Sequence, residues 1–164
     1  MAVLPLCSRH DPVLRKKAKK VTIIDSSILR IIDDMIDTMK AVSGVGLAAP
    51  QIGKSLKIAV IQIPEQETIV LINPEIIKRG GERGLTEGCL SVPGYFGEIQ
   101  RSMWVKIKAQ DRSGKEFRLR GEGLLAQALE HEIDHLNGTL YVDHLSSPEK
   151  LQKTEPQKEI DSSI

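Results

Sequence analysis

The sequence has few aromatic residues, only two cysteines and no long hydrophobic run. Aromatic residues make up 3% of the chain, so its core must be built mainly from Ile, Leu and Val. The two cysteines, Cys7 and Cys89, have unlike neighbours and do not suggest a disulfide framework, which favours a reducing compartment. No signal peptide or membrane span is recognisable. We therefore expect a cytoplasmic protein, and an organellar matrix or stroma stays compatible because a cleaved targeting peptide leaves no trace.

A strong excess of either charge is also missing. Lys and Arg number 23 against 22 Asp and Glu, giving a net charge of +1, so there is no electrostatic case for a nucleic-acid or membrane partner. The basic cluster at 15–20 is expected to be a solvated helix end. The 164 residues, of which 40% are hydrophobic, suit one globular domain. We predict this domain at 1–145, followed by a polar tail at 146–164 that is partly disordered or a frayed helix.

Hydrophobic periodicity predicts two long helices separated by strands. Apolar residues at spacings of three and four indicate a helix that begins at Asp25 or Ser26 and ends before Ser43, and a second from Gly121 to Leu136. A shorter basic helix is expected at 11–19, with strands at 57–63, at 68–73 with a possible continuation to 78, and at 104–110 with a return strand after 111–114. Glycines prevent regular helix at 44–53 and also punctuate the segment 80–97. These elements predict an α+β fold in which mainly antiparallel strands pack around the second long helix.

The second long helix carries the pattern His-Glu-x-x-His. Residues four apart on a helix differ by about 40° around its axis, so His131 and His135 project from one face and could grip one metal ion. Glu132 lies beside them and could reach a water on that ion without becoming a ligand. The alternative is a chance match on a polar helix, but the amphipathic context favours metal binding.

A catalytic metal site usually has a third protein ligand. The candidates are Cys7, Cys89, His10, His144 and the acidic residues. Cys89 is favoured because a glycine precedes it and because thiolate suits zinc or ferrous iron, although a lone cysteine is often just a small buried residue. Downstream ligands fit worse: the metzincin position is Tyr141, and a position about twenty residues on falls near Glu155 in the polar tail.

Three segments resemble the motifs of peptide deformylase, in the same order. They are GVGLAAPQ at 44–51, EGCLS at 87–91 and HEIDHL at 131–136, and the resemblance spans about 4–145. It implies a metal-dependent hydrolase that removes the formyl group from the N-terminal formylmethionine of newly made polypeptides and releases formate. The resemblance also implies Fe2+ as the native ion, with Zn2+, Ni2+ or Co2+ able to occupy the same ligands.

The resemblance also implies roles for individual residues. The family's metal ligands match Cys89, His131 and His135. Glu132 matches the general acid/base, while the Gln51 side chain and the Leu90 N–H match the groups that stabilise the oxyanion. Hydroxide formed at the metal would attack the formyl carbon. A transient association with the ribosome is compatible with such a substrate, although no basic tail supports it.

Substrate contacts are expected in two parts of the chain. Val45 and Gly46 match the backbone that pairs with the substrate peptide, and Leu124 and Ala128 could line space for the methionine side chain. Glu130 departs from the family, which usually has Gln there; it would be harmless at the surface but would add negative charge near a metal. Two other functions stay open: a peptidase that cleaves internal bonds, and a non-catalytic metal-binding module.

Overall fold

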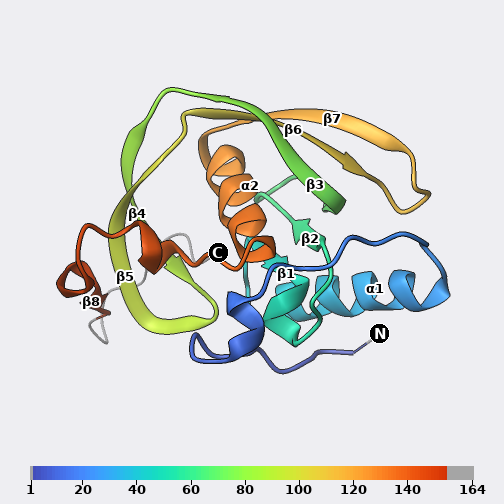
Figure 1. Cartoon of the computed structure of the whole chain (residues 1–164), viewed down its shortest axis with the longest axis horizontal. Helices are drawn as coiled ribbons and strands as arrows, with labels where there is room; N and C mark the ends of the chain where they lie inside the picture. Colours follow the sequence, from blue (N-terminus) through green and yellow to red (C-terminus); the bar gives the residue numbers. More distant parts are fainter. Residues whose placement is uncertain (1, 155–164) are drawn as a thin grey trace.

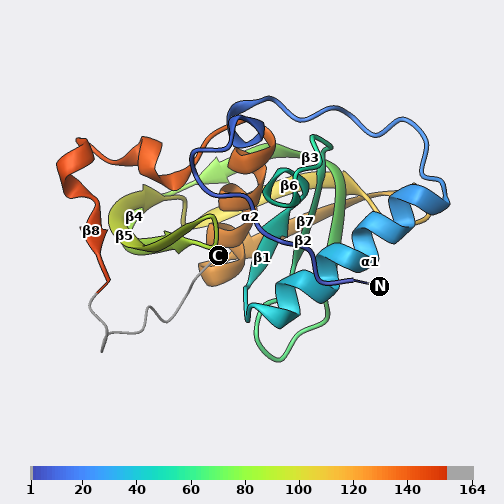
Figure 2. The ribbon, with the colours of Figure 1, turned by 90° about the horizontal axis from the view of Figure 1, so that it is seen from below.

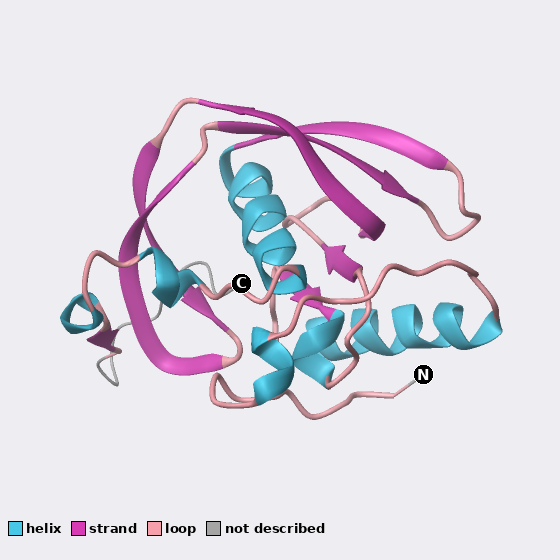
Figure 3. Cartoon of the chain, viewed as in Figure 1, coloured by secondary structure: helices cyan, strands magenta, loops and turns pink. Residues whose placement is uncertain are grey.

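The structure is a computed structural model that describes residues 2–154. Its helices and 3-10 turns (η) are η1 Pro12–Arg15, α1 Ser26–Ala41, η2 Ala49–Ile52, α2 Gly123–Leu136, η3 Tyr141–His144 and η4 Pro148–Lys150. Its strands are β1 Gly46–Ala48, β2 Ile58–Ile61, β3 Ile69–Gly80, β4 Arg83–Cys89, β5 Val92–Arg101, β6 Trp104–Gln110, β7 Glu116–Glu122 and β8 Gln152–Lys153. Figure 3 shows how the helices and strands are distributed.

The strands form two antiparallel sheets. The larger has the order β1-β2-β3-β6-β7, and the smaller has the order β4-β5-β8. β6 alternates as the sequence predicts, with Val105, Ile107 and Ala109 buried and the residues between them half-buried. The long β3 crosses the molecule beside β6 (Figure 1). The predicted α+β fold with mainly antiparallel strands is confirmed.

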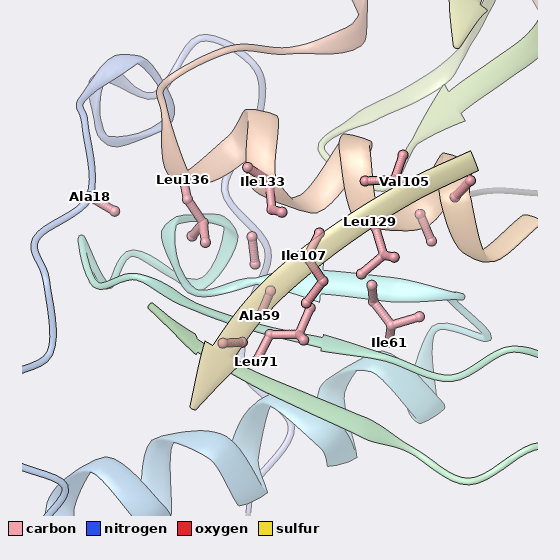
Figure 4. Close-up of a cluster of buried hydrophobic side chains, with 13 residues drawn as sticks. Ala18, Ala59, Ile61, Leu71, Val105, Ile107, Leu129, Ile133 and Leu136 are labelled. Atoms are coloured by element: carbon pink, nitrogen blue, oxygen red, sulfur yellow. The ribbon is translucent and has the colours of Figure 1, made fainter. Parts of the chain in front are cut away.

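The two long helices cover opposite faces of the larger sheet (Figure 2). All of β2 is buried because its side chains alternate between these helices. Ile58 and Val60 belong to the hydrophobic cluster that includes α1, whereas Ala59 and Ile61 pack in the cluster under α2. Figure 4 shows the second cluster, in which α2 lies against β2, β3 and β6. The helix bearing His-Glu-x-x-His is therefore central, as predicted.

Local sequence signals set the ends of both long helices. Asp25 caps α1 by accepting the N–H of Ile28 at 3.1 Å, as the sequence predicts. α2 begins two residues later than predicted because Gly121 still belongs to β7. It ends at Leu136, and Gly138 follows with a φ of 78°. A side chain at Gly138 would lie 2.7 Å from the Arg15 carbonyl oxygen, so glycine is required there.

The segment 80–97 differs most from the sequence prediction. The sequence assigned no element to this glycine-punctuated segment, but it contains β4 and the first half of β5, which form a long hairpin. Cys89 pairs with Val92, so Leu90 and Ser91 make a two-residue turn. The sequence did not show these strands because glycines weaken the strand pattern, whereas cross-strand pairing stabilises the strands in the folded chain.

Two shorter segments also differ from expectation. The predicted helix at 11–19 is only the turn η1, because Ala18 and Lys19 donate their N–H groups to Leu136 and Ser55 instead of continuing the helix. In the tail, 146–154 contains η4 and β8, and β8 pairs with Tyr95 and Phe96 of β5. The rest of the predicted tail, 155–164, lies outside the described residues. None of the helices within 2–154 has the length and apolar character needed to cross a membrane.

Candidate metal centre

The fold brings together one cysteine and two histidines from distant parts of the chain. Cys89 ends β4, whereas His131 and His135 lie one turn apart on α2. Cys89 Sγ is 3.4 Å from His135 Nε2, and the Nε2 atoms of the two histidines are 3.1 Å apart. The three ligand atoms lie within 4.8 Å of one another, and all three residues are buried. The three residues that the sequence nominates as ligands thus form one cluster.

The donor set fits a divalent transition metal. Two imidazole nitrogens and a sulfur converge in a buried space, and nitrogen and thiolate ligands suit iron, zinc, nickel and cobalt better than magnesium or calcium. Both histidines present Nε2 to the cluster. Three protein ligands leave a coordination position for water or substrate, as in catalytic rather than structural sites.

Glu87 fixes the orientation of one histidine. Its Oε2 lies 2.7 Å from His131 Nδ1, and its two oxygens accept hydrogen bonds of 3.0 and 2.7 Å from Arg101. Burial alone would raise the pKa of Glu87, but the charge and hydrogen bonds of His131 and Arg101 outweigh it and lower that pKa to about 2. An ionised Glu87 accepts a hydrogen bond from the Nδ1–H of His131, which leaves the Nε2 lone pair free for a metal.

Arg101 extends this network to the protein surface. It is 4% exposed and also donates to Asp134 at 2.8 Å, and Asp134 is bound in turn by His144 Nε2 at 2.8 Å. Sequence reasoning missed Glu87 and Arg101. Glu87 stands in a quoted motif, but nothing in the sequence links it with Arg101 on the next strand.

Glu132 follows His131 on α2, and its carboxylate is unpaired among the described residues. Among the described residues neither carboxylate oxygen has a hydrogen-bond partner, and the side chain is fully buried. Burial is the largest cause that raises its pKa, to about 7. A carboxyl group with such a pKa can take up and release a proton near neutral pH.

Gln51 reaches the cluster from η2 and is fully buried. Its Oε1 accepts the N–H of Ala48 at 3.0 Å, and its Nε2 donates to Ser91 Oγ at 3.1 Å and lies 3.7 Å from Cys89 Sγ. Leu90 lies in the same turn as Ser91. The two groups nominated for the oxyanion therefore flank Cys89. Sequence reasoning did not nominate Ser91.

The residues nominated for substrate binding come from β1 and its approach and from the first half of α2. Val45 is half-buried, whereas Gly46 is buried and opens β1, an edge strand that is paired only with β2 in the described part of the chain. Gly46 packs against Glu132, since a Cβ there would lie 2.4 Å from Glu132 Oε2. Leu124 is half-buried, and Ala128 is fully buried in the cluster under α2.

Glu130 is neither at the surface nor among the ligands. It is 4% exposed and accepts hydrogen bonds from the N–H and hydroxyl of Ser102, at 2.7 and 3.0 Å, and from Arg79 at 2.9 Å. This carboxylate therefore anchors α2 to β3 and to the end of β5.

Comparisons with known proteins agree with one another. A family model described as polypeptide deformylase matches residues 3–151. The peptide deformylase of Dehalococcoides mccartyi strain BAV1 is 54% identical over 165 residues, covering 100% of this chain and 99% of the relative. That of Heliobacterium modesticaldum is 50% identical over 147 residues, covering 90% and 97%.

Solved structures give the same result. The crystal structure of a peptide deformylase from Legionella pneumophila has a TM-score of 0.88 at 50% identity and covers 91% of this chain and 89% of its own. The crystal structure of peptide deformylase from Thermotoga maritima has a TM-score of 0.86 at 40% identity and covers 90% and 100%.

Proposed function

The chain belongs to the polypeptide deformylase family, and we propose that it removes the formyl group from the N-terminal formylmethionine of newly made polypeptides and releases formate. The observation that carries this proposal is the buried cluster of Cys89, His131 and His135 beside the unpaired carboxylate of Glu132. A chain of this family is a peptide deformylase, an amide hydrolase, and the cluster supplies the groups that amide hydrolysis needs.

Cys89, His131 and His135 would hold one divalent ion, with Fe2+ as the proposed native metal and Zn2+, Ni2+ or Co2+ as substitutes. Such an ion, when bound, supplies Lewis acidity that lowers the pKa of a water molecule and polarises a carbonyl group. Glu87 supports this arrangement because its hydrogen bond holds the ring of His131 in place.

Glu132 is the proposed general base and acid. Its buried carboxylate has no hydrogen-bond partner within 2–154, so it is available to take a proton from the attacking water. Glu132 then gives that proton to the amine that leaves when the bond from the formyl carbon to nitrogen breaks.

The Gln51 side chain and the Leu90 N–H are the proposed donors to the oxyanion of the formyl group. Their places beside Cys89 support these roles, since Gln51 Nε2 is 3.7 Å from Cys89 Sγ and Leu90 is the next residue along the chain. Loss of one such donor costs about 3 kcal/mol of transition-state stabilisation.

The substrate peptide would pair with the backbone at Val45 and Gly46, along the open edge of β1. Leu124 and the small Ala128 would line the space for the methionine side chain. A formyl carbon carries only hydrogen, so a narrow site could select it over bulkier acyl groups. The unpaired state of Cys7 and Cys89 fits a reducing compartment such as the cytoplasm, and a transient ribosome contact would suit a nascent-chain substrate.

Formate release from a formyl-Met-Ala-Ser peptide tests this function. Protein purified anaerobically and loaded with Fe2+ or Ni2+ is expected to release formate and to leave acetyl-Met-Ala-Ser and unformylated Met-Ala-Ser intact. Absence of formate with both metals would overturn the proposal. Cleavage within the unformylated peptide would instead support a peptidase, and metal binding without any hydrolysis would support a non-catalytic module.

A further inference from the structure

Ser91 lies in the turn between β4 and β5, directly after Leu90. Its side chain is 1% exposed, and its hydroxyl oxygen accepts the 3.1 Å hydrogen bond from Gln51 Nε2. Gln51 comes from η2, so this bond joins the turn that carries Cys89 and Leu90 to the segment that follows β1.

The Gln51 carboxamide has one favourable orientation. Its Oε1 accepts the N–H of Ala48, and a flipped amide would set its own N–H groups against that donor. Nε2 must therefore face the β4–β5 turn, where it meets Ser91 Oγ at 3.1 Å and Cys89 Sγ at 3.7 Å. Sulfur is a weak acceptor. Ser91 therefore takes one N–H firmly, and the second is held only weakly beside the ligand cluster.

We propose that Ser91 is a positioning residue that holds the Gln51 carboxamide so that its second N–H faces the oxyanion of the reaction. The inference rests on the proposed function, in which Gln51 stabilises that oxyanion. An amide held at its oxygen by Ala48 and at its nitrogen by Ser91 needs no reorganisation when negative charge develops. Without the hydroxyl group, only the oxygen is held and one buried N–H loses its partner.

Steady-state kinetics of Ser91→Ala test the proposal. The variant is expected to release formate from formyl-Met-Ala-Ser with a kcat roughly 3- to 10-fold below that of the unmodified protein. KM should stay within about twofold, because the aligned N–H acts on the transition state, and metal content per chain should not change. An unchanged kcat would overturn the proposal.

Ser102→Ala is the matched control. It removes another buried serine hydroxyl from the end of the same hairpin, but one that donates to Glu130 at 3.0 Å and does not contact Gln51. It should lower the melting temperature and leave kcat near that of the unmodified protein. An equal kcat loss in both variants would assign Ser91 a general structural role and overturn the proposal.

A double-mutant cycle with Gln51→Ala separates positioning from stability. Because Ser91 acts through Gln51, adding Ser91→Ala to Gln51→Ala should cost no further kcat. If the two losses multiply, Ser91 does not act through Gln51 and the proposal fails.

A spectroscopic measurement on unmodified protein needs no turnover, and it tests the geometry without Ser91→Ala. In Zn2+-loaded protein with isotope-labelled glutamine, a Gln51 side-chain amide proton should show cross-relaxation with the β protons of Ser91; the signal lost in Gln51→Ala assigns it. Absence of that contact overturns the inference. Failure of the proposed function is a separate result, because the unmodified protein would then release no formate.

Discussion

At the scale of single residues, the hydrogen atom of Gly46 leaves room for the carboxylate of Glu132. A methyl group there would lie 2.4 Å from Glu132 Oε2 and 3.0 Å from its carboxyl carbon. The side chain of Glu132 would have to move, because a contact this short is not tolerated. Gly46 on β1 therefore constrains the position of the proposed base on α2.

Gly46→Ala is expected to lower kcat on the order of 100-fold, because a displacement of about 1 Å is enough for such a loss. Formate release measures it, with Glu132→Ala as the reference for complete loss of the base and Gly84→Ala as the control. Gly84 lies on β4, and a Cβ there meets only Gln100 at 3.4 Å. Both glycine variants should bind metal normally. A kcat for Gly46→Ala equal to that of Gly84→Ala would show that the Glu132 position is not set in this way.

Glu87→Gln should weaken both metal binding and the fold. The change removes the charge that balances buried Arg101 and replaces one carboxylate oxygen with an NH2 donor, so Arg101 and His131 can no longer keep all their acceptors. Loss of such a partner lowers metal affinity roughly 10- to 100-fold, and leaving a buried charge poorly compensated costs about 3 kcal/mol. Competition with a chelator measures the affinity for Zn2+, and urea unfolding measures the stability. Affinity equal to that of the unmodified protein would remove Glu87 from the metal site.

The residues of the site differ in how far the sequence predicts them. His131 and His135 could be placed together because the geometry of a helix relates positions four apart. Cys89 was favoured by its chemistry and then matched by the resemblance, although nothing local shows how β4 approaches α2. The Arg101–Glu87 pair and the Ser91–Gln51 bond could not be predicted, because each joins residues that meet only through the tertiary fold.

At the scale of elements, α1 depends on its cap at Asp25. The Ser27 hydroxyl and then the Ile28 N–H lower the pKa of this carboxyl group below its usual range, so the cap is strongest when ionised. A depressed folded-state pKa contributes stability above the unfolded pKa of about 4, and this contribution is lost as the pH falls through the folded value.

Asp25→Ala is therefore expected to lower the melting temperature at neutral pH. The gap in melting temperature between the variant and the unmodified protein should shrink as the pH falls below about 4. Thermal unfolding followed by circular dichroism across this pH range measures the gap. Asp25→Asn is the control, since its amide oxygen caps the helix at every pH. A gap for Asp25→Ala that does not change with pH would show that the ionised carboxylate is not what stabilises α1.

Elements with a clear period were predicted well and the hairpin was not. α1, α2 and β6 each have one face against a core, so their apolar residues repeat at the period of a helix or strand. β4 and β5 pair mainly with each other and place few large apolar residues against the main core. Their stability comes from cross-strand pairing, which leaves a weaker trace in the sequence.

At the scale of the whole molecule, removal of the metal should destabilise the fold. The three ligands come from both β4 and α2, and an ion that binds only the folded chain at 100 times its Kd adds about 2.7 kcal/mol. This amount corresponds to a rise of roughly 5 to 10 °C in Tm. Calorimetry of Zn2+-loaded and chelator-treated protein measures the shift, which should be smaller in Cys89→Ser. Equal Tm values with and without Zn2+ would contradict a shared site.

The division of the ligands between the hairpin and α2 also has a kinetic consequence. The hairpin end that carries Cys89 rests on a small cluster with Val92, Ile99 and Tyr141, whereas α2 is embedded in the main core. The bound cation would then link the hairpin end, which has only this small cluster, to a helix in the main core. The ion would dissociate to a chelator only when the hairpin opens locally from α2. Its dissociation rate would therefore report the rate of this local opening in the native state.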